Sequence, residues 1–104
     1  MAELPAEGLR LDIWLWRARF FRTRALATEH VNRRGIRISR NGETRKTTKP
    51  GTRIGPGDLL TFSRAQRLER IQIIELGTRR GPAPEAQALY SRIETETEHL
   101  WPIF

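Results

Sequence analysis

The residues most able to do chemistry in this 104-residue chain are its arginines, which are densest between residues 10 and 49. Guanidinium groups bind phosphate through paired hydrogen bonds and keep their charge at physiological pH. Residues 8–80 hold 18 basic and 6 acidic side chains, and the whole chain has a formal net charge of +7. Solubility needs only a modest charge of either sign, so this excess predicts a polyanionic partner.

The predicted binding surface has two parts, a pair of helices and a hairpin that follows them. At the start of the second helix, Thr23 and Arg24 rank highest, because the free amide groups there can share a phosphate with an arginine. The hairpin also carries Arg40 and Arg45. The predicted RNA-binding residues are Arg10, Arg17, Arg19, Arg22, Thr23, Arg24, Arg33, Arg34, Arg37, Lys46 and Lys49.

The sequence offers no catalytic or metal-binding group. His30 and His99 are isolated from each other, and the chain has no cysteine, so no set of ligands has metal-site spacing. His30 is expected to be a packed or interfacial residue. No serine has an adjacent histidine, and no glycine-rich segment leads into Gly-Lys-Thr. We therefore predict a protein that is not an enzyme and that needs no cofactor or metal.

A helix must position the first arginines, and residues 9–19 have the required periodicity. Leu11, Trp14 and Leu15 recur at helical spacing and predict a buried face. Two phenylalanines in the basic elbow that follows are expected to close the core. Burying an arginine without a partner is costly. We therefore expect the guanidinium groups around this elbow to converge on one outward surface.

Residues 23–34 predict a second helix with a similar division into two faces. Thr23 is a suitable N-cap and Gly35 a suitable C-cap. The apolar stripe of this helix consists of Leu26, Ala27, His30 and Val31. The arginines of the helix lie off that stripe, as expected of a helix with one buried and one solvated face.

The segment after the second helix has the pattern of a β-hairpin. Residues 36–38 alternate apolar and basic side chains, and Asn41-Gly42 favours a type I′ turn into a polar strand over residues 43–48. Two further strands are expected at residues 59–63 and 70–76. Core positions in the second of these are Ile71, Ile73 and Ile74.

The last part of the chain predicts a helix from Pro84 or Glu85 to about Glu98. A proline and a glutamate both suit the first turn of a helix. Residues 100–104 are apolar but too few to cross a membrane, so they are expected to pack on the body or on a second copy. We expect a monomer, with a homodimer through this apolar end as the alternative.

The motifs match a known family. Arg10-Leu11-Asp12, Leu15, Thr23-Arg24, Ala27 and Val31, followed by a β-type stretch ending in Asn41-Gly42, resemble the RNA-binding domain named after small-subunit ribosomal protein S-four. The longer run RLDIWLWRARFFRTRALA is similar to the ribosome-associated heat shock protein 15 family. The resemblance implies an α+β fold, the alpha-L RNA-binding motif. In it, a helix pair packs on a small, mostly antiparallel twisted sheet with a C-terminal helix.

The resemblance also implies a function. Such proteins bind ribosomal RNA of the large ribosomal subunit, especially subunits that still carry a nascent chain on transfer RNA after translation aborts, often under heat stress. Other targets stay open: transfer RNA, a different ribosomal RNA site or DNA. A role as the RNA-targeting subunit of an RNA-modifying enzyme also stays open, although a partner would then have to supply the catalytic domain.

Three parts of the chain are expected. Residues 1–7 form a flexible leader, residues 8–80 form the RNA-binding domain of the ribosomal protein S-four type, and residues 81–104 form the C-terminal helix and apolar end. The lack of cysteine fits a reducing compartment, and no apolar run has membrane-spanning length. We therefore predict a cytoplasmic protein that does not engage a membrane.

Overall fold

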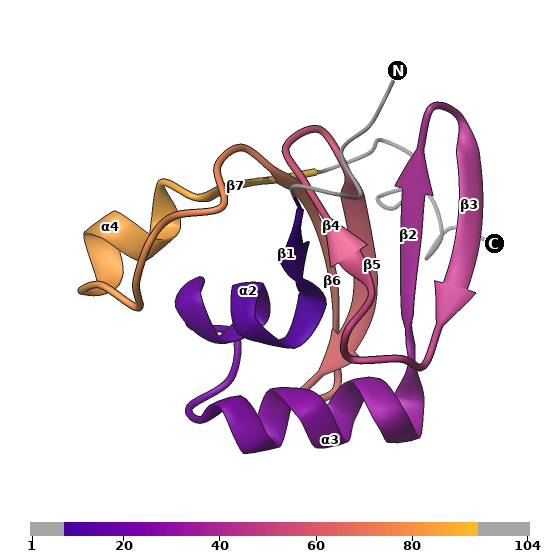
Figure 1. Cartoon of the computed structure of the whole chain (residues 1–104), viewed down its shortest axis with the longest axis horizontal. Helices are drawn as coiled ribbons and strands as arrows, with labels where there is room; N and C mark the ends of the chain where they lie inside the picture. Colours follow the sequence, from indigo (N-terminus) through magenta and orange to yellow (C-terminus); the bar gives the residue numbers. More distant parts are fainter. Residues whose placement is uncertain (1–7, 94–104) are drawn as a thin grey trace, which may run out of the picture.

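The computed structural model describes residues 8–93, so our expectations for residues 1–7 and 94–104 lie outside it. The elements are β1 (Leu9–Arg10), α2 (Leu11–Arg17), α3 (Arg24–Arg34), β2 (Ile36–Arg40), β3 (Glu43–Thr47), β4 (Arg53–Ile54), β5 (Leu59–Arg64), β6 (Arg67–Ile73), α4 (Ala83–Gln87) and β7 (Tyr90–Arg92). Figure 1 shows α2 and α3 beside the sheet, with the β2–β3 hairpin on the side away from α4. None of the helices in residues 8–93 combines the length and apolar character needed to cross a bilayer.

The main sheet has five antiparallel strands in the order β3-β2-β5-β6-β7, and β1 pairs separately with β4. Side chains alternate between its two faces. Leu60 and Ile71 are paired neighbours on the inner face and are fully buried, whereas Arg37 and its neighbour Thr61 face outward. The inner face packs on α2 and α3, and the α+β prediction is confirmed.

The first helix buries the face that its periodicity predicts. Leu11, Trp14 and Leu15 are inaccessible to solvent. The Trp14 indole Nε1 donates a hydrogen bond to the Glu75 carbonyl oxygen at 3.0 Å, which joins α2 to the end of β6. Phe20 is buried behind the helix, so the elbow closes the core through this ring.

The second helix has the predicted caps but a narrower buried stripe. Thr23 Oγ1 accepts a hydrogen bond from the Leu26 amide at 3.0 Å, and Gly35 ends the helix with a φ of 80°. Only Ala27 and Val31 are buried within α3. The Leu26 side chain is 43% exposed, so its assignment to a buried stripe is wrong. The helix packs on the core through Ala27 and Val31, and Leu26 lies outside that core cluster.

The hairpin turn is confirmed by positive φ angles at Asn41 and Gly42, 54° and 81°, as a type I′ turn requires. The prediction of one long C-terminal helix is wrong within the described residues. Helix α4 ends at Gln87, and β7 then pairs with β6, with Tyr90 opposite Ile73. Because β6 would otherwise be an open edge, strand pairing there satisfies backbone groups that a helix would leave unpaired.

The end of β6 also differs from expectation. Ile71 and Ile73 are buried as predicted, but Ile74 is 46% exposed. Ile73 faces the core at the end of β6, so alternation directs the next side chain to the opposite face. Leu89 fills the adjoining core position instead and is buried.

Candidate nucleic-acid interface

The densest group of unpartnered cations lies where α3 ends and β2 begins. A Cβ atom added at Gly35 would lie 2.6 Å from Lys46 Cε, so the Lys46 side chain runs across this glycine. Arg37 is the cross-strand partner of Lys46, and both therefore project from the same face of the hairpin. With Arg34, they line a hollow of about 200 Å³. We call Arg34, Arg37 and Lys46 the Gly35 cluster.

The Gly35 cluster is electrostatically uncompensated. All three side chains are exposed, and none has an acidic or hydrogen-bonding partner among the described residues. Like charges gathered around one hollow repel one another, and a bound anion would relieve that repulsion. Thr61 and Ser63 line the same hollow and supply hydroxyl donors. The arrangement is therefore suited to holding phosphate groups.

The other cations that have no partner in the described part of the chain lie at three places. Arg22 and Arg24 flank Thr23 at the exposed start of α3. Arg45 and Lys49 line a hollow of about 520 Å³ on the opposite face of the β2–β3 hairpin. A further exposed arginine, at position 67, begins β6. These positions extend the positive surface along α3 and around the hairpin.

Arg17 in α2 and Arg19 at the start of the elbow have a different environment. Arg17 Nη1 donates hydrogen bonds to the carbonyl oxygens of Leu76 and Gly77, at 3.4 and 2.6 Å. Arg19 Nε donates to the Gly81 carbonyl oxygen at 2.7 Å. The expectation that all elbow arginines converge on one outward patch is therefore wrong. The irregular segment over residues 76–81 presents carbonyl groups that need donors, and these arginines satisfy them.

Two predicted arginines are ion-paired. Arg10 donates to both carboxylate oxygens of Asp12, at 3.1 and 3.0 Å. Burial alone would raise the pKa of Asp12, but hydrogen bonds from Arg10 and Thr28 outweigh it and lower that pKa. Arg33 pairs with Glu29 at 3.1 Å on the exposed face of α3. Such an exposed pair is weak, so a phosphate could replace Glu29.

The hairpin arginine Arg40 is also held by the fold. It donates to both carboxylate oxygens of Asp58, each at 2.8 Å, and Asp58 is 2% exposed. Conversely, Arg45 and Arg67 have no partner among the described residues. The sequence placed Arg45 on the basic hairpin, and period-two alternation puts it on the hairpin face opposite Lys46. Arg67 lies outside the predicted set.

The described residues contain no group of three potential metal ligands. His30 Nε2 is shielded from solvent without a hydrogen-bond partner. Burial, followed by the nearby Arg34 charge, lowers the pKa of His30. Its neutral ring packs against Phe21, with ring centroids 5.0 Å apart, as expected of a packed residue.

No protein-family model matches the chain. Among curated relatives, a heat shock protein 15 homolog from Aeromonas salmonicida is 36% identical over 93 residues, covering 86% of this chain and 67% of the relative. Heat shock protein 15 of Escherichia coli K12 is 35% identical over 98 residues, covering 94% and 70%. A trimeric structure of Vibrio cholerae heat shock protein 15 matches with a TM-score of 0.74 and 31% identity, covering 92% of both chains.

Proposed function

Because the chain belongs to the heat shock protein 15 family, we propose that it is a non-catalytic protein that binds structured RNA. Its proposed target is ribosomal RNA of the large ribosomal subunit. Its proposed role is the rescue or recycling of stalled subunits that carry a nascent chain on transfer RNA, in response to heat stress. The protein would act in the cytoplasm, without a cofactor or metal.

The observation that carries this proposal is the Gly35 cluster. Three cations without an acidic partner in residues 8–93 surround one hollow, at a point where a helix and a hairpin meet. Folding gains nothing from bringing these charges together, whereas binding a polyanion does. Their heads are exposed, so a phosphate can reach them without any rearrangement of the chain.

The shape of α3 supports a folded RNA target. Its 11 residues span about 16 Å, which separates Arg24 at one end from the Gly35 cluster at the other. Two cationic positions at that separation can contact phosphates on two sides of a shallow groove. The minor groove of A-form RNA is wide and shallow and is recognised largely by shape and backbone contacts. Residues 8–80 would carry the binding surface, while residues 81–93 support α2 and β6.

The test is co-sedimentation with purified large subunits, with two double variants that each remove two positive charges. Arg37→Gln with Lys46→Gln changes the Gly35 cluster. Arg79→Gln with Arg92→Gln changes exposed arginines that are ion-paired with Glu85 and Glu69. We expect the first variant to stay in the supernatant and the second variant to sediment with the subunits. If both variants sediment like the unmodified protein, the cluster is not the contact surface.

The alternative targets require a separate comparison. Affinities for large subunits, transfer RNA, another ribosomal RNA fragment and duplex DNA, measured at one salt concentration, would rank them. A stronger affinity for transfer RNA or DNA would overturn the ribosomal assignment but keep the binding surface. Turnover of an RNA substrate by the purified protein would contradict a non-catalytic role.

The oligomeric state needs its own measurement, because the Vibrio cholerae relative was solved as a trimer. Light scattering of the full chain and of the chain without residues 100–104 distinguishes a monomer, a homodimer through the apolar end and a trimer. We propose a monomer. A loss of self-association on truncation would show instead that the apolar end joins copies.

A further inference from the structure

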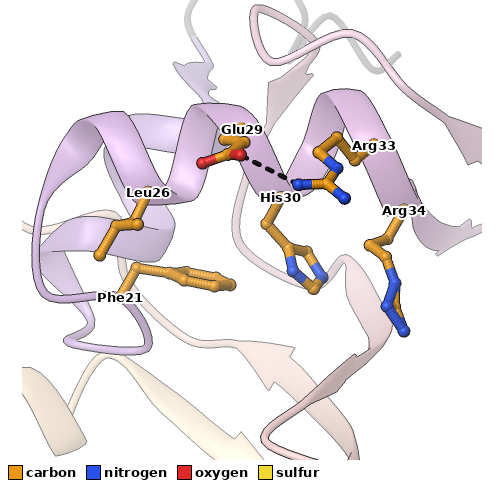
Figure 2. Close-up of a pocket in the computed structure, with 6 residues that line it drawn as sticks. All are labelled: Phe21, Leu26, Glu29, His30, Arg33 and Arg34. Atoms are coloured by element: carbon orange, nitrogen blue, oxygen red, sulfur yellow. Dashed lines mark hydrogen bonds and ion pairs between the residues drawn. The ribbon is translucent and has the colours of Figure 1, made fainter.

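Two neighbouring hollows lie along α3, and the second of them reaches the turn that joins β5 to β6. They measure about 330 and 650 Å³ and share Phe21, His30 and Arg34 as lining residues. In Figure 2 the Phe21 and His30 rings project from the α3 side into the same space, with Arg34 beside them. We call this paired space the α3-flank hollow.

The walls of the α3-flank hollow are apolar and partly aromatic. The Phe21 and His30 rings lie 5.0 Å apart at an angle of 44°. Leu26 and Leu68 line the hollow and are 43% and 62% exposed. In the described part of the chain, three large apolar side chains are exposed, and these are two of them. The third, Ile74, does not line either hollow.

The rim of the hollow is cationic. Arg34 and Arg67 line it without acidic partners among the described residues. The carboxylate at the rim, Glu29, is already paired with Arg33. The lowered pKa of His30 leaves its ring uncharged at neutral pH. Two uncharged aromatic rings are thus bordered by two guanidinium groups that have no acidic partner in residues 8–93.

We propose that the α3-flank hollow receives the base of one unpaired nucleotide, which stacks on Phe21 and His30 while Arg34 and Arg67 hold the adjoining phosphates. This inference rests on the proposed RNA-binding function, because Arg34 belongs both to this hollow and to the Gly35 cluster. Aromatic side chains stack on any base, since every base has a π-face. The protein therefore recognises structured RNA that displays an unpaired base next to its duplex.

A nucleotide fits this site better than an apolar peptide does. An apolar segment would cover the rings and the two leucines, but it would leave the charges of Arg34 and Arg67 uncompensated at its edge. A nucleotide supplies a planar apolar face together with negative charge on its backbone. A nucleotide therefore complements both the apolar side chains and the two guanidinium groups of the hollow.

The test uses two RNA hairpins that differ by one nucleotide. The bulged RNA has one unpaired adenosine that the fully paired RNA lacks, and 2-aminopurine replaces this adenosine to report stacking. We expect the bulged RNA to bind about tenfold more tightly than the paired RNA. We also expect the 2-aminopurine fluorescence to fall on binding. Leu68→Ser and Phe21→Leu should each remove most of this preference. The matched control, Ile74→Ser, removes an exposed apolar side chain outside the hollow and should retain it.

The outcomes separate this inference from the function on which it rests. Equal affinity for the two RNAs without a fluorescence change would overturn the base site and leave RNA binding intact. Failure of both RNAs to bind would overturn both. Loss of self-association in Leu68→Ser, with no change in RNA preference, would assign the hollow to a second copy of the chain. Because Leu68 is mostly exposed, Leu68→Ser tests the site even if Phe21→Leu fails to fold.

Discussion

Arg17 and Arg37 represent two regions that are equally rich in arginine but differ in what surrounds each guanidinium group. At the end of α2, Arg17 and Arg19 donate hydrogen bonds to backbone carbonyls of residues 76–81. Around the end of α3, the Gly35 cluster has no acceptor among the described residues. Residue type alone therefore does not make a binding surface. An arginine is available to a ligand only where the fold supplies it with no acceptor.

Buried carboxylates follow the same division. Asp12, Asp58 and Glu69 are each at most 3% exposed, and each binds at least one arginine. None of them lines the hollow of the Gly35 cluster. Acidic groups thus organise one set of arginines as part of the fold and leave the other set to the solvent.

The largest expected effect is on RNA affinity when the Gly35 cluster is removed. The triple change Arg34→Gln, Arg37→Gln and Lys46→Gln should weaken binding roughly a thousandfold at low salt, because three charged hydrogen bonds are lost. The slope of log affinity against log salt should fall by about 2.7. Fluorescence anisotropy across a salt series measures both. An unchanged slope would mean that these cations contact no phosphate. The Gly35 cluster would then be no more available to RNA than the arginines of α2.

The next effect is on stability and concerns an arginine that the fold holds. Asp58→Asn should lower the free energy of unfolding by about 3 kcal/mol, because it weakens a buried carboxylate's bonds to Arg40 and to the Gly55 amide. Denaturant unfolding measures the loss. Glu43→Gln is the matched control, because Glu43 is an exposed acid on the hairpin that carries Arg40. The free energy of unfolding of this variant should stay within about 0.5 kcal/mol of that of the unmodified protein. An equally small change in the free energy of unfolding for Asp58→Asn would show that the Arg40–Asp58 ion pair contributes little to stability.

A smaller effect is expected at Arg17. Arg17→Gln should cost about 1.5 kcal/mol of stability, because it removes charged hydrogen bonds to the segment over residues 76–81. RNA affinity should change less than threefold. Denaturant unfolding measures the stability of this variant, and fluorescence anisotropy measures its RNA affinity. A large loss of affinity in a stable Arg17→Gln protein would show that Arg17 contacts the RNA. The α2 arginines would then belong to the binding surface, as the Gly35 cluster does.

The smallest effect is the pH dependence that His30 contributes. Its pKa is lower in the folded protein than in the unfolded chain, where it is about 6.5. The unfolded state therefore binds the proton more readily, and stability decreases as pH falls from above 6.5 toward the folded pKa. Melting temperatures at pH 7.5 and 5.5 should differ more for the unmodified protein than for His30→Gln. An equal difference in melting temperature in both proteins would contradict the lowered pKa of His30.

Local patterns predicted much of the fold. The buried face of α2, the Thr23 cap and the Asn41-Gly42 turn depend on side chains close together in sequence, and the structure confirms them. The failures involve partners distant in sequence. The exposure of Leu26 depends on where α3 meets the sheet, and β7 exists because β6 offers it an edge.

The excess of positive charge, the helix pair, the hairpin and the resemblance to an RNA-binding family could all be read from the residues alone. Which arginines remain available to a ligand depends on contacts made in the folded chain. The acceptors for Arg17 and Arg19 arrive from residues 59 to 62 positions away along the chain. Hydrogen bonding acts over a few ångströms whatever the separation in sequence. No local pattern could therefore distinguish these arginines from the Gly35 cluster.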